Sequence, residues 1–413
     1  MRMYYRKNIS KISALLTALI ITNFFSHFIK SITGTGATTY YICYICWGVY
    51  FIYLYVIKQN VLELRFVMIL MFLFVSAYVG AIWGQIFIGK GYSEFHKVFF
   101  IIVAIACTTN RRLNTYLVKD DIECIFKGAV FSTFIPTVYT IIAQNRIILE
   151  LVKGQRINYN SWKLTSFFGQ RNVFGESCFI GLCACMYLYR SRKHLFYLMV
   201  IILQYIMIYL TNSRSALLGA TITIAYNYIY KKKNKYLYVL FVIGLLFVLF
   251  YYLGLSDYIM SSRATHRAFN GEDSGMLRIH LWKLSIQYLL QCKAMLFGFG
   301  WGNIAYFRNP YGLGSAHSMY VDALFDGGIV FLSFLVYNIF KSYKKINSIP
   351  DANYRCSMIS NMVAFLTYCT LEAGMALFQS NYFSVTTTIL FIAIPNMYVG
   401  DNGEHQQGNE DKS

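Results

Sequence analysis

The sequence predicts an all-α protein that crosses a membrane about 12 times, and three observations support this prediction. Of the 413 residues, 57% are hydrophobic and only 13% are charged, which is roughly half the charged fraction of a soluble domain. Apolar runs of about 20 residues, the length that crosses a bilayer as a helix, recur along nearly the whole chain. The runs lack the alternation of barrel strands, so helices are expected to satisfy the backbone hydrogen bonds in lipid.

Each predicted span is one of these apolar runs. The spans are residues 11–28, 37–57, 64–88, 95–108, 122–143, 173–189, 195–210, 215–230, 236–254, 318–340, 356–378 and 382–399. The first follows a basic cluster and lacks a small-residue cleavage site, so we expect a retained signal anchor. We expect residues 1–400 to form one membrane domain and residues 401–413 to form a disordered cytoplasmic tail.

The formal net charge of +19 does not indicate nucleic acid as a partner, because of how the cations are distributed. Many lie in short clusters between alternate spans, which predicts that both termini are cytoplasmic. Two predicted outer loops, 144–171 and 255–317, are long and basic, and long loops are exempt from this rule. An anionic ligand is the simplest explanation for their charge. Within the second loop, Gly275–Leu296 has apolar residues at helical spacing and predicts an amphipathic helix in the outer interface, before the tenth span.

Several polar residues at the predicted outer surface are candidates for chemistry. His317 ends the second loop directly before a span, and imidazole titrates near neutrality. Arg214 is an isolated cation in a tight outer turn, Arg278 lies on the predicted amphipathic helix, and Arg171 opens a span. Each also has a structural explanation: an exposed interfacial histidine, or an arginine that extends its head group to the interface. His266 and His280 lie in the same loop, and composition does not rank the three histidines.

Two acidic residues follow His317 in the first turns of the tenth span. Asp322 and Asp326 are costly in lipid, so each is expected to face protein or water. Either could orient the imidazole or bind sugar hydroxyls, and stabilisation of the helix N-terminus is an equally simple role. The outer loops show no cysteine, histidine or carboxylate cluster with metal-ligand spacing, so we expect neither a metal nor another cofactor.

Four motifs in order make the chain resemble the O-antigen polymerase and O-antigen ligase superfamily. They are Ser213–Leu218, Leu277–Trp282, Phe297–Gly300, and Ala316–Tyr320 with Gly327–Ile329. The similarity covers roughly residues 165 to 335. The resemblance implies that His317, Arg214 and Arg278 are the functional residues, with Arg171 as a weaker correspondence. The ligase pattern after the histidine departs at Phe331, which stands where that pattern has Gly, Thr or Tyr.

The resemblance implies a bacterial inner-membrane glycosyltransferase that joins undecaprenyl-pyrophosphate-linked repeat units on the outer face, without a metal. Asp322 and Asp326 are expected to contact substrate, and a chain-length regulator and a flippase are expected partners. The main alternative is a ligase that transfers the finished glycan to lipid A–core, and Phe331 favours the polymerase. A flippase would place its key charges at mid-membrane and show repeat symmetry, and the sequence shows neither. A non-enzymatic membrane scaffold would not explain the arginines on the outer side.

Overall fold

The computed structural model describes residues 2–34, 64–89, 117–152, 164–211, 213–232, 275–307, 315–377 and 383–398. These residues form helices and no β-strand, which confirms the all-α prediction. By length and composition, four of the helices are suited to crossing a membrane. The predicted spans 37–57, 95–108 and 236–254 and the tail 401–413 lie outside the described residues. The total of about 12 spans therefore stays a prediction.

Most of the described helices lie on the predicted apolar runs, whereas α6 and α13 lie in the two segments predicted as long loops. The bounds of the described helices are α1 Arg2–Thr33, α3 Leu64–Phe87, α5 Lys119–Ala143, α6 Asn145–Val152, α7 Arg171–Arg192, α8 Leu195–Thr211, α9 Arg214–Lys232, α13 Gly275–Gln291, α14 Met319–Asn347, α15 Ala352–Leu371, α16 Ser384–Thr388 and α17 Ile394–Met397. A π-helical turn, Ile389–Ala393, joins α16 to α17. Short 3-10 helices lie at Ser166–Phe168 and Asn303–Tyr306. Helix α13 overlaps the predicted amphipathic segment Gly275–Leu296, and its place in an outer loop stays a prediction.

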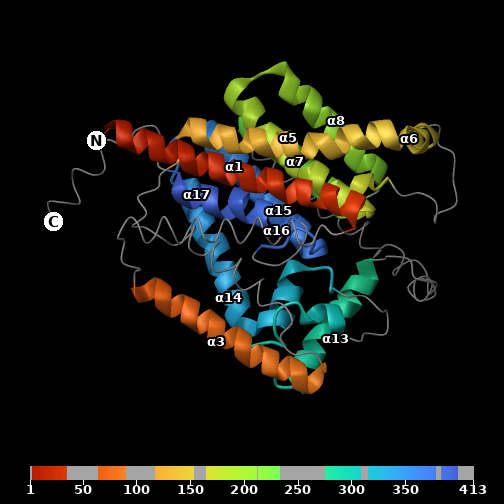
Figure 1. The fold of residues 1–413 in the computed structure, drawn as a ribbon, viewed down its shortest axis with the longest axis vertical. Helices are drawn as coiled ribbons and strands as arrows, with labels where there is room; N and C mark the ends of the chain where they lie inside the picture. The colour runs from red at the N-terminus through yellow and green to blue at the C-terminus, as the bar shows by residue number, and fades with distance from the viewer. Residues whose placement is uncertain are drawn as a thin grey trace.

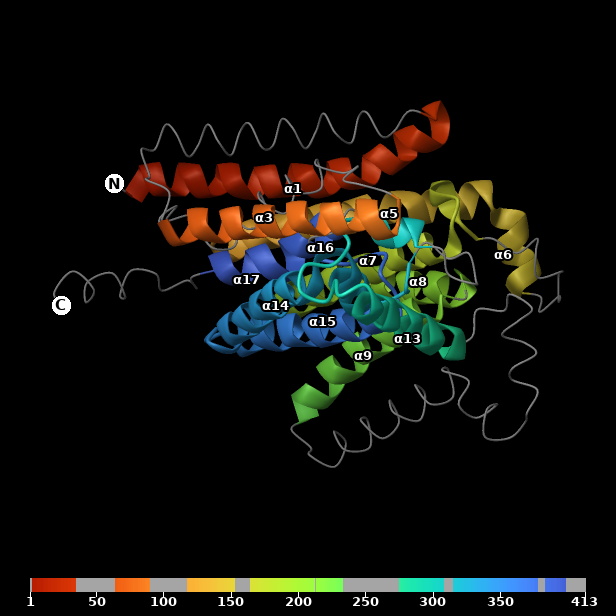
Figure 2. The ribbon, with the colours of Figure 1, turned by 90° about the horizontal axis from the view of Figure 1, so that it is seen from below.

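The helices form two groups, and α14 joins them (Figure 1). The larger group contains α1, α5, α7, α8, α9 and α15, whose side chains bury the main hydrophobic core. In Figure 2, α1 and α9 lie on opposite sides of this group. The smaller group consists of α3, α13 and the segment after α13, which pack on the first part of α14 around Phe299, Phe325 and Leu289.

Helix α14 is broken at Gly328, which the prediction of one continuous tenth span did not anticipate. Gly328 has φ 65° and ψ −165°, a conformation that only glycine adopts readily. The backbone groups that the break leaves without helical partners bond to the loop segment 295–300 instead. These bonds are Phe299 N–H to Phe325 O (2.9 Å), Gly300 N–H to Asp326 O (2.8 Å), Ile329 N–H to Met295 O (2.9 Å) and Val330 N–H to Leu296 O (3.3 Å). A non-helical backbone is tolerated at membrane depth only when it is satisfied in this way.

The eleventh predicted span, 356–378, is also shorter than expected. Helix α15 begins after Asp351, whose carboxylate accepts the N–H groups of Asn353 and Tyr354 at 2.8 and 3.1 Å and so caps the helix. It ends at Leu371, and residues 372–377 are not helical. The prediction that the span continues to Phe378 is wrong. The apolar run contains the carboxylate of Glu372, which follows the last helical residue and contacts other segments of the fold.

The two ends of the larger group differ in their polar contacts. At one end, Arg192 Nε donates to Glu123 at 2.7 Å and Arg190 Nη1 donates to Asn227 Oδ1 at 2.8 Å. At the other end, the first turn of α7 packs on the turn between α8 and α9, where a Cβ at Gly175 would lie 2.6 Å from Ser213 Cβ. The start of α14 and the end of α15 meet at this second end, which holds the candidate site.

Candidate functional site

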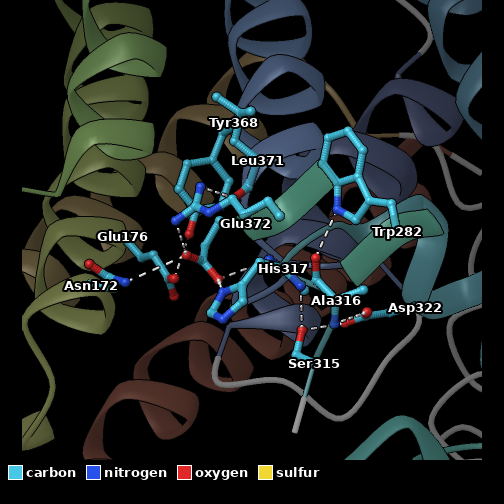
Figure 3. Close-up of polar contacts among 12 residues, drawn as sticks. Asn172, Glu176, Trp282, Ser315, Ala316, His317, Asp322, Tyr368, Leu371 and Glu372 are labelled. Carbon is cyan, nitrogen blue, oxygen red and sulfur yellow. Dashed lines mark hydrogen bonds and ion pairs between the residues drawn. The ribbon is translucent and has the colours of Figure 1, made fainter. Parts of the chain in front are cut away.

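Glu372 is the centre of a polar cluster that joins four parts of the fold. His317 Nδ1 lies 2.9 Å from Glu372 Oε1, and Arg278 Nη2 lies 3.6 Å from Oε2. The Asn172 amide lies 3.5 Å from the same Oε2. Arg278 also donates to the backbone carbonyl of Leu371, which fixes the guanidinium beside the carboxylate. Figure 3 shows three side chains converging: Asn172 from α7, His317 from the start of α14 and Glu372 from the end of α15. We call His317, Glu372, Arg278 and Asn172 the His317 cluster.

The charges of the cluster are largely removed from solvent. The exposed fraction is 8% for the Glu372 side chain, 14% for Arg278 and 23% for His317. Burial alone would raise the pKa of Glu372, but the hydrogen bond of His317 and its charge when the ring is protonated, with the Arg278 guanidinium and the Ala373 N–H, hold that pKa below its ordinary value. The carboxylate is therefore ionised at neutral pH and supplies a fixed negative charge to the imidazole.

His317 is held by strained backbone as well as by its side chain. Its φ is 53°, in the left-handed region that non-glycine residues rarely occupy. Its N–H donates to Ser315 Oγ at 2.9 Å, and Ser318 then starts α14 in an extended conformation. Strain of this kind costs about 1–3 kcal/mol and persists where the surrounding structure enforces it, often at functional sites.

Asp322 enforces this turn from within α14. Its Oδ1 accepts the Ala316 N–H at 2.8 Å, and its Oδ2 accepts the Ser315 hydroxyl at 2.7 Å. From the other side, the Trp282 indole N–H of α13 donates to the Ala316 carbonyl at 2.8 Å. The residues before His317 are therefore clamped between two helices.

Asp326 holds the neighbouring loop in the same manner. Its two carboxylate oxygens accept the N–H groups of Gly302 and Ile304 at 2.9 and 3.0 Å. Asp322 and Asp326 are both buried. The structure thus gives each predicted substrate-binding aspartate two contacts with the loop, and any contact with substrate remains a proposal.

The other two predicted arginines lie at this end of the bundle, and neither is bonded to Glu372. Arg214 is exposed as the first residue of α9. Arg171 begins α7, one residue before Asn172 of the cluster. The fold therefore brings His317 and Arg278 into one cluster, with Arg214 and Arg171 at the same end of the protein.

The sequence prediction missed Glu372, Asn172 and Glu176. Glu176 lies in the second turn of α7, is 1% exposed, and accepts the Tyr368 hydroxyl at 2.5 Å. Both glutamates fall inside predicted spans, and an ionisable residue inside a span is itself a signal of function. That signal identifies the two carboxyl groups but not their partners. Among the described residues, no three His, Cys, Asp or Glu side chains are arranged to hold a metal ion.

Comparison with known proteins gives one family match, which covers part of the chain. No curated protein matches the chain. Residues 197–336, which include Arg214, Arg278 and His317, match a protein-family model described as O-antigen ligase. The apolar helices and this match together indicate a multi-pass membrane protein. Residues 197–336 therefore form an O-antigen ligase-like domain, which supports the assignment of the chain to the O-antigen polymerase and ligase superfamily.

Proposed function

We propose that this protein is a polysaccharide polymerase that joins undecaprenyl-pyrophosphate-linked repeat units on the outer face of the bacterial inner membrane. The observation that carries the proposal is the carboxylate–imidazole–guanidinium cluster of Glu372, His317 and Arg278 at one end of an apolar helix bundle. Two of the three residues lie in the region that matches the family model. The arginines Arg190 and Arg192 at the opposite end of the bundle support a cytoplasmic location for that end.

In this proposal, His317 is the general base. Glu372 accepts a hydrogen bond from His317 Nδ1, which fixes the tautomer and leaves the lone pair of the neutral ring on Nε2. Nε2 takes the proton of the acceptor sugar hydroxyl as that oxygen attacks the donor's anomeric carbon, and Glu372 stabilises the imidazolium that forms. General base catalysis of this type typically contributes about 10²–10⁴-fold.

The arginines have a separate role in the same step. As the new glycosidic bond forms with inversion, the bond between the anomeric carbon and the pyrophosphate oxygen breaks. The leaving pyrophosphate gains negative charge, which guanidinium groups stabilise through charge-assisted hydrogen bonds. Arg278 stands in the cluster and Arg214 at the same end of the bundle, where both would bind the pyrophosphate with help from Arg171. Asp322 and Asp326 would contribute by holding the loops of the site.

A ligase that transfers the finished glycan to lipid A–core is the second candidate, since it would use the same donor and the same residues. The gel pattern of the envelope glycan separates the two reactions. We would delete the gene and complement it with the wild type, His317→Ala or Arg278→Ala. The polymerase predicts core bearing one repeat unit in the deletion, with a ladder restored by the wild type and lost in both variants.

Matched controls are available for both substitutions. His194→Ala changes an exposed histidine between α7 and α8, and Lys283→Ala changes an exposed cation on the same helix as Arg278. Both should restore the ladder. Bare core, with polymerised glycan still on its lipid carrier, would show that the protein is the ligase. A full ladder with His317→Ala or Arg278→Ala would disprove the role assigned to that residue.

A further inference from the structure

A second carboxyl group lies behind the His317 cluster, and the proposed reaction does not use it. Glu176 is 1% exposed and belongs to α7, which also supplies Asn172. Figure 3 shows its side chain directed toward Glu372, with Tyr368 beside both. Gly374, two residues after Glu372, packs so closely on the Glu176 carboxyl group that a Cβ there would overlap both of its oxygens. The fold therefore encloses Glu176 against the chain that carries Glu372.

The contacts of Glu176 do not compensate a negative charge. Its Oε1 accepts the Tyr368 hydroxyl, while its Oε2 is buried and has no hydrogen-bond partner among the described residues. Among the described residues, the ion pairs of Arg278 and His317 at this site are made with Glu372 and not with Glu176. Removing one member of a buried ion pair destabilises a protein strongly, because a buried charge is left uncompensated. An uncharged carboxyl oxygen without a partner is much less costly.

The surroundings of Glu372 are different, because they do contain cations. The titratable groups that face Glu372 are His317, Arg278, Glu176, Tyr368 and Cys369. Two of these groups, His317 and Arg278, can carry positive charge, and both bond to Glu372 rather than to Glu176. The site thus provides compensation for one carboxylate, and that carboxylate is Glu372.

One contact argues in the opposite direction. The 2.5 Å bond from Tyr368 to Glu176 has the length of a hydrogen bond to an ionised oxygen. A single such bond offsets only part of the cost of burying a second negative charge beside Glu372 without a cation. Because the described contacts do not compensate a charge on Glu176, the neutral form of its carboxyl group is favoured.

We propose that Glu176 is a neutral carboxylic acid at neutral pH and acts as a positioning residue for Glu372. It fills the space between α7 and Gly374 and holds the Tyr368 hydroxyl, without adding charge that would compete with Glu372 for His317 and Arg278. The positioning role rests on the proposed function. The protonation of Glu176 does not depend on which reaction the site performs.

The protonation is tested by infrared difference spectroscopy on the full-length protein in lipid nanodiscs at neutral pH. We would subtract the spectrum of Glu176→Gln from that of the wild type in H₂O and in D₂O. The expected result is the carbonyl band of one neutral carboxyl group that shifts in D₂O. In Tyr368→Phe, which removes the hydrogen bond to Glu176, the same band should move to higher frequency. A difference spectrum that contains only carboxylate bands would overturn the proposal.

The positioning role is tested by comparing variants in polymerisation rate. Gln is the neutral counterpart of a protonated Glu, so Glu176→Gln should retain activity to within about threefold, whereas Glu176→Ala should lose more because it leaves a cavity and an unpaired Tyr368. If folded Glu176→Gln loses as much polymerisation activity as Glu372→Gln does, a charge is required at position 176. If His317→Ala instead retains activity, the proposed function fails while the infrared band is unaffected.

Discussion

Replacing Glu372 by glutamine tests the proposed site most directly, because it removes the shared negative charge and keeps the size of the side chain. The lost interaction is the 2.9 Å contact with the His317 ring at a position that is 8% exposed. A hydrogen bond to a charged group contributes about 1.5–3 kcal/mol. In the proposed reaction this stabilisation is needed when the imidazolium forms. Since about 1.4 kcal/mol changes a rate tenfold, the expected loss is roughly 10- to 150-fold in kcat.

The rate would be measured with purified protein in nanodiscs and lipid-linked repeat units, by following chain growth on gels. The matched control is Asp120→Asn, which removes an exposed carboxylate at the opposite end of the bundle. The control should retain the wild-type rate, since surface ion pairs contribute little. Thermal unfolding of both variants would establish that they are folded.

A wild-type rate for folded Glu372→Gln would refute the reasoning, because the imidazole would then act without its carboxylate. The double variant Glu372→Gln/His317→Ala provides a second check. If the two residues act as one unit, the double variant should be no slower than His317→Ala alone.

Three further predictions follow from other features of the structure. Arg214→Ala should abolish glycan polymerisation but leave the melting temperature unchanged, because Arg214 is exposed; lost stability would mean a structural role. Gly328→Ala should destabilise the protein by at least about 1–3 kcal/mol, since φ is 65° and the Cβ would overlap the Leu296 backbone, and thermal unfolding in detergent would detect this. Because the pKa of Glu372 is lower in the folded protein, its stabilising contribution is present above the unfolded pKa and is lost as pH falls through the folded pKa. Glu372→Gln should therefore flatten the decline of melting temperature below pH about 4, and an unchanged decline would contradict the assigned charge.

Much of the fold could be predicted because apolar runs determine where helices form in lipid. Helices α5, α7, α8 and α9 begin and end within a few residues of the predicted spans. The break in α14 could not be predicted in the same way. Gly327 and Gly328 permit it, but its bonds come from residues 295–300, about 30 positions earlier in the chain.

The site shows the same limit. His317 and Arg278 were predicted from their place in the chain and from the resemblance, and the structure joins them through Glu372. That residue was missed because its contact with His317 spans 55 positions, and hydropathy averages over a window much shorter than this. Asp322 contacts Ser315 and Ala316, since a buried carboxylate takes the nearest available N–H and O–H donors. Its predicted contact with substrate stays a prediction.

The bonds between loop segment 295–300 and the break in α14 also restrict how the protein can move during a catalytic cycle. If the site takes a growing polymer, as we propose, it must admit that chain, and a loop before the histidine would be one place for a lid. This segment is poorly suited to that role, because lifting it would leave the Phe325 and Asp326 carbonyls and the Ile329 and Val330 amides without their backbone partners. Residues 295–300 and the break in α14 are therefore expected to stay together as one unit, and we expect other parts of the protein to control access to the site.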